Sequence, residues 1–235
     1  DIGEFKIAGS IKELYDENSE HTSPQASLLI SDTFSEDRFG VLLALSYQER
    51  QTRLNQAQTD GWLENTDIPQ SEINGGAGFS GNTFLARNYD HKVTFEERTR
   101  KGGSLVLQFA PSDNVRMTAD ALYSDFDIET DATSFGHWFT APNLEDVRTD
   151  DNGTIIDLYQ EVGLATDMHA KKFDRLTETA SYGFNVSWDV NDKLNLSFDV
   201  NTSNAERDAN NGGGDQLSLI GYANRVRLQL MPGEI

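Results

Sequence analysis

Aromatic side chains in two long polar stretches are the residues of this chain best suited to hold a ligand. The stretches lie near residues 54–93 and 129–171, and their candidates are Trp62, Phe79, Tyr89, Phe135, His137, Trp138 and Phe139. Exposed rings can stack on sugar faces or surround a siderophore. Rings in long loops also pack the loops together, and for any single residue this is the more common role. We predict ligand binding by these loops as a group and leave the role of each ring open.

A run of alternating acids is the candidate for a metal site. Asp125, Asp127, Glu129 and Asp131 stand at every second position, so a strand would place their carboxylates on one face. Such oxygen ligands suit a hard cation, for example Ca²⁺. A solvated acidic rim explains the same pattern with fewer assumptions. We therefore predict no metal site and keep this run as a weak calcium candidate.

Catalytic chemistry has little support in the sequence. The chain has no cysteine and four histidines, and the histidines lack the spacing typical of metal ligands. Asp150 to Ile155 resembles part of a calcium-binding EF-hand loop, but Arg148 and Tyr159 stand where its terminal carboxylates belong. A turn at Asn152-Gly153 is the better interpretation. We predict neither enzymatic activity nor a cofactor.

The composition narrows the class of partner. A formal net charge of -20 argues against nucleic acid, because its phosphates require Lys and Arg. No run of apolar residues approaches the roughly 20 that a transmembrane helix needs. Strands can nevertheless cross a bilayer with a low average hydropathy, since only every second residue faces lipid.

Period-two alternation of apolar residues is the strongest pattern in the chain. It is clearest from Tyr182 to Val190, where every second residue is apolar and the residues between are small or polar. After the pair Asn191-Asp192 it resumes from Leu194 to Val200. Two strands with one apolar face each, joined by a short turn, are typical of a β-hairpin.

The same pattern predicts about eight strands and two kinds of connection. The strand ranges are 3–15, 24–34, 38–53, 94–110, 115–128, 172–190, 193–206 and 215–231. Short turns at 35–37, 111–114 and 191–192 alternate with longer connections at 16–23, 54–93, 129–171 and 207–214. Short turns on one side and long loops on the other are typical of outer-membrane proteins. We predict an all-β fold, an antiparallel up-and-down transmembrane β-barrel of which this chain forms part.

Aromatic residues mark a common level on three predicted strands. Tyr47, Tyr123 and Tyr182 each fall at the long-loop end of an apolar face. Amphipathic rings at one level form the girdle of a barrel at the headgroup region, and we assign Trp188 to the girdle residues as well. The alternative fold is a soluble β-sandwich that binds glycans, but it explains neither the common level nor the alternation of turn lengths.

Several short phrases resemble a known family when they are taken in order. They are Ser31 to Phe34, Phe39 to Leu43, Phe109 to Asp113, Asp120 to Ser124 and Asn211 to Asp215. Together they resemble the barrel of large TonB-dependent receptors of proteobacteria, especially the type often associated with carbohydrate uptake. The resemblance covers nearly the whole chain outside the two longest loops.

The resemblance implies a receptor in the outer membrane of a Gram-negative bacterium. Its partners would be outer-membrane lipid, a small ligand such as an oligosaccharide or a siderophore, and the TonB complex, reached through a plug domain. Carbohydrate is favoured over siderophore as the ligand. No plug or TonB-box-like segment occurs in these 235 residues, so we expect the chain to be part of a longer receptor. The alternatives are a passive or adhesive outer-membrane barrel and a complete small barrel.

Overall fold

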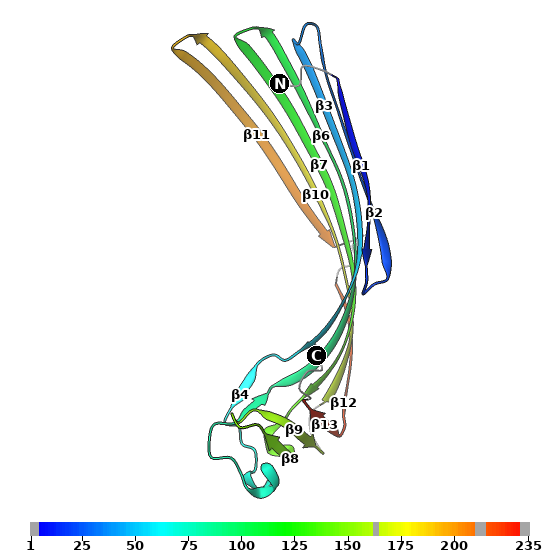
Figure 1. The fold of residues 1–235 in the computed structure, drawn as a ribbon, viewed down its shortest axis with the longest axis vertical. Coiled ribbons are helices and arrows are strands. Elements are labelled where there is room, and N and C mark those ends of the chain that lie inside the picture. The colour runs from blue at the N-terminus through cyan, green and yellow to red at the C-terminus, as the bar shows by residue number, and fades with distance from the viewer. Residues whose placement is uncertain (1–4, 162–164, 210–214, 231–235) are drawn as a thin grey trace. The chain divides into compact units, whose positions relative to one another are not determined.

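The computed structural model of the chain describes residues 5–161, 165–209 and 215–230. Apart from three short 3-10 turns, all regular structure in these residues is β-strand, and the main sheet is antiparallel and up-and-down (Figure 1). The predicted all-β, antiparallel fold is therefore confirmed at this level. The chain divides into two compact units: unit 1 is Asp1–Arg53, Phe95–Thr130 and Phe173–Gln216, and unit 2 is Leu54–Thr94, Asp131–Lys172 and Leu217–Ile235.

Among the described residues, eight strands form the main sheet. Its order is β1-β2-β3-β6-β7-β10-β11, and β12 also pairs with β10. The strands are β1 (Lys6–Asp16), β2 (His21–Phe34), β3 (Phe39–Gln58), β6 (Asn88–Ser112), β7 (Val115–Trp138), β10 (Ala165–Asn191), β11 (Leu194–Ala209) and β12 (Gln216–Ala223). Each strand predicted from the alternation has a counterpart in this sheet. Five of them, β3, β6, β7, β10 and β12, contribute residues to both units.

The last predicted strand is divided in two. Instead of one strand over 215–231, β12 pairs with β10, while β13 (Val226–Gln229) pairs with β9 (Ile155–Gln160). The apolar residues change face between Leu219 and Val226, which is where the chain leaves the main sheet. The predicted turn at Pro232-Gly233 and most of the predicted loop 207–214 lie outside the described residues.

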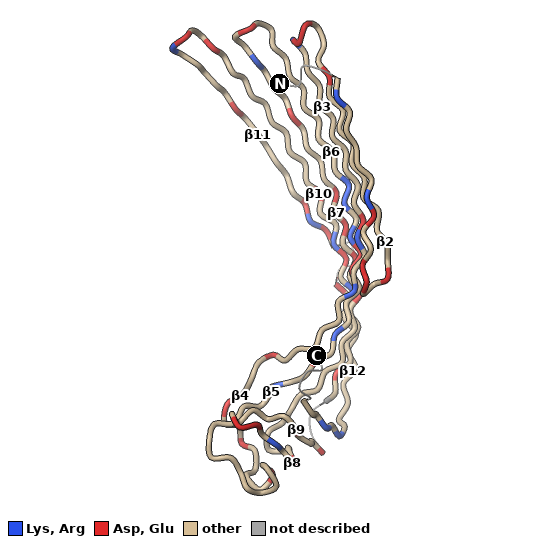
Figure 2. Tube along the Cα trace, in the orientation of Figure 1, with Lys and Arg blue, Asp and Glu red and all other residues tan. Residues whose placement is uncertain are grey.

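The strand register gives the sheet of unit 1 two different faces. Leu28 is opposite Leu45 and Phe184 is opposite Val200, and directly opposed residues of neighbouring strands lie on the same face. We call this side the apolar face. The other side, which carries Ser27 opposite both Ser10 and Ser46, is the polar face. Figure 2 shows that much of the length of these strands carries few charged residues.

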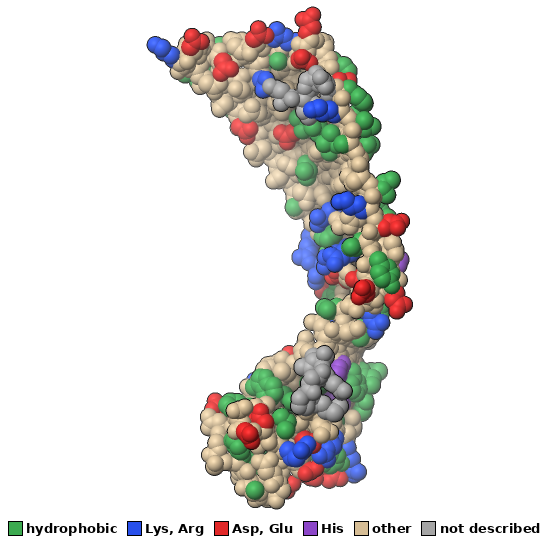
Figure 3. Space-filling view, in the orientation of Figure 1, with side chains coloured by type: hydrophobic (Ala, Val, Ile, Leu, Met, Phe, Trp, Pro, Cys, Tyr) green, Lys and Arg blue, Asp and Glu red, His purple; other side chains and the backbone are tan. Residues whose placement is uncertain are grey.

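The described residues of unit 1 form no hydrophobic core. Among its described residues no hydrophobic side chain is buried, since all the buried ones belong to unit 2. Many large side chains of the apolar face are instead more than a third exposed, including Leu28, Leu45, Leu107, Phe109, Phe184, Trp188, Leu196 and Phe198. Hydrophobic side chains (green) accordingly reach the surface of this unit in Figure 3.

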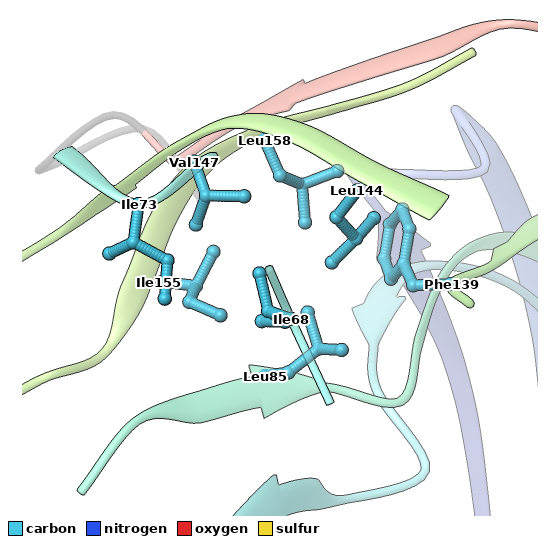
Figure 4. Close-up of a cluster of buried hydrophobic side chains, with 8 residues drawn as sticks. All are labelled: Ile68, Ile73, Leu85, Phe139, Leu144, Val147, Ile155 and Leu158. Carbon is cyan, nitrogen blue, oxygen red and sulfur yellow. The ribbon is translucent and has the colours of Figure 1, made fainter. Parts of the chain in front are cut away.

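Unit 2 folds from the two stretches that the sequence suggested were loops. β4 (Trp62–Glu64) pairs with β5 (Phe84–Ala86), and β8 (Leu144–Thr149) joins β9 and β13 in a three-stranded sheet. The 3-10 turns η1 (Gln70–Glu72), η2 (Asn74–Gly76) and η3 (Ala141–Asn143) connect these strands. Their apolar side chains point toward one another in a compact core (Figure 4): Ile68, Ile73, Leu85, Phe139, Leu144, Val147, Ile155 and Leu158.

Candidate functional site

Three tyrosines meet on the apolar face of unit 1. Tyr47 of β3, Tyr123 of β7 and Tyr182 of β10 line the same hollow of about 960 Å³. The Tyr123 hydroxyl donates a hydrogen bond to Glu178 Oε1 at 2.7 Å, and the Tyr47 hydroxyl donates one to Glu49 Oε2 at 3.0 Å. The rings thus lie among apolar side chains while their hydroxyls contact carboxylates, which is the placement that suits an interface between lipid and water.

Trp188 lies on the same face but near the other end of it. It is opposite Leu196, close to the short turn between β10 and β11, and 44% of its surface is exposed. The structure therefore groups the three tyrosines with one another and separates Trp188 from them. The assignment of these four residues to the girdle of a membrane barrel stays a prediction.

Three of the candidate loop aromatics belong to the packing of unit 2. Phe139 is part of the core, and Phe79 and Tyr89 pack against it. Trp62 of β4 is 48% exposed. Packing thus accounts for three of these rings, whereas Trp62 keeps a surface that a ligand can reach.

The other candidate residues lie near the end of β7. The rings of Phe135 and His137 meet edge to face, with centroids 4.7 Å apart, and Trp138 is partly buried. The His137 Nδ1 is 2.9 Å from Thr166 Oγ1, which donates a hydrogen bond to Asn224 Oδ1 at 2.6 Å. Burial lowers the pKa of His137, and the nearby His91 lowers it further. The contact between His137 and Thr166 joins β7 to β10, and ligand binding by Phe135, His137 and Trp138 stays a prediction.

A polar cluster in unit 2 was not predicted from the sequence. Asn88 is fully buried; its side-chain amide donates to Asp60 Oδ2 at 3.0 Å and Asp90 Oδ2 at 3.1 Å, and its Oδ1 accepts from the Asp60 N–H at 2.7 Å. Burial raises the pKa of Asp90, and the Asp60 carboxylate adds to the increase. No sequence pattern joins these residues, because 28 positions separate Asp60 from Asn88.

The two metal-like patterns of the sequence have different outcomes. Within the described part of the chain, no three His, Cys, Asp or Glu side chains are arranged to hold one metal ion. The run from Asp125 to Asp131 follows β7 and stays an acidic strand face. Asp150 Oδ1 accepts the N–H groups of Asn152 and Thr154 at 2.9 and 2.7 Å, and Gly153 has a φ of 85°. The predicted turn at Asn152-Gly153 is therefore confirmed.

The polar face of unit 1 contains a shallow hollow that sequence reasoning missed. It has a volume of about 630 Å³, and its lining combines the polar residues Ser10, Ser27, Ser46, Arg100, Ser104 and Ser124 with a larger apolar surface from residues such as Leu29, Ala44 and Leu122. A Cβ atom at Gly102 would come within 2.9 Å of Ser46 Oγ, so the absence of a side chain there keeps the hollow open. The Arg100 guanidinium carbon lies 4.1 Å from the centre of the Phe126 ring. Hydroxyls beside a guanidinium suit a polar ligand.

Comparison with protein-family models, curated proteins and solved structures finds no match to this chain. Among the described residues, no helix is long and apolar enough to cross a membrane.

Proposed function

We propose that unit 1 forms part of the wall of a transmembrane β-barrel in the outer membrane of a Gram-negative bacterium. The barrel serves as a receptor for TonB-coupled uptake of a scarce small ligand, with carbohydrate favoured over siderophore, and it is not an enzyme. Its partners are outer-membrane lipid, the ligand, and the TonB complex through a plug domain of the full protein.

The observation that carries the proposal is a sheet that has an apolar face but, among the described residues of unit 1, no buried hydrophobic side chain. In water, burial of hydrophobic side chains is the main source of stability. The described residues of unit 1 bury none of theirs, although one face is rich in Leu, Phe and Trp. A lipid bilayer supplies the missing apolar environment without a second protein layer.

The single layer of unit 1 also disfavours the soluble sandwich. A sandwich packs two sheets face to face, about 10 Å apart, with a shared core between them. The described strands of unit 1 all belong to the one main sheet. Phe184 and Phe198 are exposed. Contact with lipid would cover these side chains, whereas a sandwich would need a second sheet to cover them.

The receptor part of the proposal rests on the resemblance of the sequence phrases and on unit 2. A passive pore needs only short connections, whereas 54–94 and 131–172, together with the segment that begins at Leu217, form a unit with its own core. Folded outer segments of this kind suit ligand capture. Loss of ligand uptake in a host that lacks TonB would support energy coupling, and unchanged uptake would favour the passive barrel.

A nitroxide scan along β11 tests the membrane placement. The chain has no cysteine, so single Cys residues can be introduced and spin-labelled in the full-length protein within outer-membrane vesicles. Phe198→Cys probes the apolar face, and the adjacent Ser197→Cys is its matched control on the polar face, where Ser197 is opposite Ser187. We expect the label at 198 to collide mainly with oxygen, which is soluble in lipid, and the label at 197 mainly with a water-soluble nickel chelate.

Extension of the scan over 194–201 should give oxygen accessibility with a period of two. Equal access of the nickel chelate to both labels would contradict the membrane placement, as would a full-length protein that stays folded in buffer without detergent.

A further inference from the structure

Basic side chains gather in one band on the polar face of unit 1. This basic band consists of Lys12, Arg50, Arg98, Arg100, Arg175 and Arg207. They come from five strands, β1, β3, β6, β10 and β11, and Figure 2 shows blue positions of these strands within one part of their length. The chain as a whole carries a net charge of -20, so this concentration of positive charge is unlike its average surface.

The strand register places Lys12 and Arg100 at the same level of the sheet. Lys12 is opposite Gln25, which is opposite Gln48. Gly102 of β6 lies beside Ser46 of β3, because a Cβ atom at Gly102 would come within 2.9 Å of Ser46 Oγ. Arg100 precedes Gly102 by two residues, and Gln48 follows Ser46 by two. Since the strands are antiparallel, Arg100 and Gln48 are also side by side.

The register also places Arg175 and Arg207, on β10 and β11, at the other end of the basic band. Arg100 lies over Phe126, and Arg207 is opposite Thr177 on β10. Arg175 is two residues from Thr177 and is therefore a diagonal neighbour of Arg207 on the same face. Two guanidinium groups at neighbouring positions of one face can bind the same anionic partner.

Three of the six basic side chains in the band have no acidic partner among the described residues. Within the part of the chain that the structure describes, Lys12, Arg100 and Arg207 form no ion pair. The other three have acidic neighbours: Arg98 pairs with Glu96, Arg175 is 3.8 Å from Asp215, and Arg50 interacts with Asp16. The guanidinium of Arg100 keeps its hydrogen-bond donors available because its main contact is the face of a ring.

Acidic residues occupy the opposite side of the sheet at a similar level. Glu49 and Glu178 bind the two tyrosine hydroxyls on the apolar side, and Glu206 is opposite Glu178. At this level the polar face carries the basic band with its acidic neighbours Asp16 and Glu96, whereas three acidic residues, Glu49, Glu178 and Glu206, gather on the apolar face.

We propose that the basic band, with the serine-lined hollow next to it, binds an acidic oligosaccharide that carries carboxylate or sulfate groups on several sugars. Strands lie about 4.8 Å apart, so Arg100 and Arg207, three strands apart in the sheet order, are separated by roughly 15 Å. One small anion cannot reach both, whereas a short charged glycan can. The hydroxyls of Ser10, Ser27 and Ser46 and the amides of Gln25 and Gln48 supply hydrogen bonds to sugar hydroxyls.

This inference rests on the proposed function, because the polar face lines a ligand path only in a barrel. The test uses the full-length protein in detergent and isothermal titration calorimetry. The probes are tetragalacturonate and a sulfated galactotetraose, each against its uncharged counterpart, the methyl ester and the unsulfated tetramer. We expect at least one acidic probe to bind about tenfold more tightly than its counterpart at low salt, with the difference shrinking as salt is added.

Substitutions of Arg100 and Arg207 test whether these two residues bind the acidic probe. Arg100→Gln with Arg207→Gln should weaken binding of the preferred acidic probe by about tenfold and leave the uncharged probe unchanged. Arg100→Lys with Arg207→Lys, which keeps the charge, should retain most of the affinity. Arg38→Gln is the matched control, since Arg38 lies at a short turn and pairs with Asp113 at 2.7 Å.

The outcomes separate this inference from the proposed function. If the spin-label scan supports membrane placement but neither acidic probe is preferred over its counterpart, the ligand assignment is wrong and the barrel stands. The ligand assignment is also wrong if the Gln variants fail to fold and the wild type does not prefer an acidic probe. The basic band then neutralises acidic residues of the protein itself. If the Gln variants fail to fold, the salt-dependent preference of the wild type decides alone.

Discussion

At the scale of single residues, Asp157 joins the three strands of the small sheet in unit 2. It lies on β9 with 3% of its surface exposed. Its Oδ2 accepts hydrogen bonds from Arg148 of β8 at 2.7 Å and from Arg227 of β13 at 3.0 Å. Burial raises the pKa of Asp157, but the hydrogen bonds from Arg227 and Arg148 outweigh it, and the pKa lies below its ordinary value.

A carboxyl with a lowered pKa stabilises the fold above its unfolded pKa and loses this effect as pH falls through the folded value. The unfolded pKa is about 3.9, so we expect β13 to open more readily as pH falls below about 4. Asp157→Asn should remove the stabilising effect of the carboxylate at pH 7 and lower the free energy of opening of β13 by about 1–3 kcal/mol. Hydrogen exchange of residues 226–229, measured by mass spectrometry in the full-length protein, reports this opening.

Asp146→Asn is the control for this prediction. Asp146 contacts Arg227 at 2.9 Å from an exposed position, so its loss should change the opening by less than about 1 kcal/mol. Equal exchange in wild type and Asp157→Asn at pH 7 would show that the two arginines do not hold β13.

At the scale of elements, unit 2 has a core that can fail separately from the main sheet. Leu158 of β9 is 1% exposed and packs in the core. Leu158→Ala should cost about 2–5 kcal/mol, because it leaves a cavity. We expect faster proteolysis within 60–87 and 139–160, whereas the resistance of the full-length protein to unfolding in SDS without heating stays unchanged. Leu219→Ala, at a position of β12 that is 55% exposed, is the matched control and should have neither effect.

The alternation of residues explains which elements could be predicted. In β10 and β11 the apolar residues lie on one face of the paired strands, so Tyr182 to Val190 and Leu194 to Val200 show an unbroken period of two. The strands β4, β5, β8 and β9 of unit 2 are three to six residues long. A period cannot be established over so few residues, and neighbours such as β4 and β5 are far apart in sequence.

The candidate site shows the same division. The level of the three tyrosines could be predicted, because strand length and register follow from local patterns. The packing of Phe139 with Ile68 and Leu85 could not, since it depends on contacts between two distant stretches. The basic band was missed because its six residues belong to five strands, and no local sequence pattern joins Lys12 with Arg207.

At the scale of the whole molecule, the main sheet is open in the residues that the structure describes. β1 and β11 each have one paired neighbour in it, so each presents a row of backbone N–H and C=O groups without a strand partner. In water such an edge is hydrated, but in lipid each unsatisfied group costs several kcal/mol, which is why membrane sheets close into barrels. The proposed function therefore requires further strands to pair with both edges.

This requirement predicts how the 235-residue chain behaves alone. Refolded by itself into lipid vesicles, it should fail to insert as a monomer: it stays accessible to protease and shows no shift in mobility between unheated and heated SDS gels. The full-length protein, in which the edges have partners, should show both protection and the shift. Insertion of the chain as a dimer, seen by cross-linking, would mean that two copies pair their edges and would support the same argument. A protected monomer would contradict it, because the sheet would then close on itself with these strands alone.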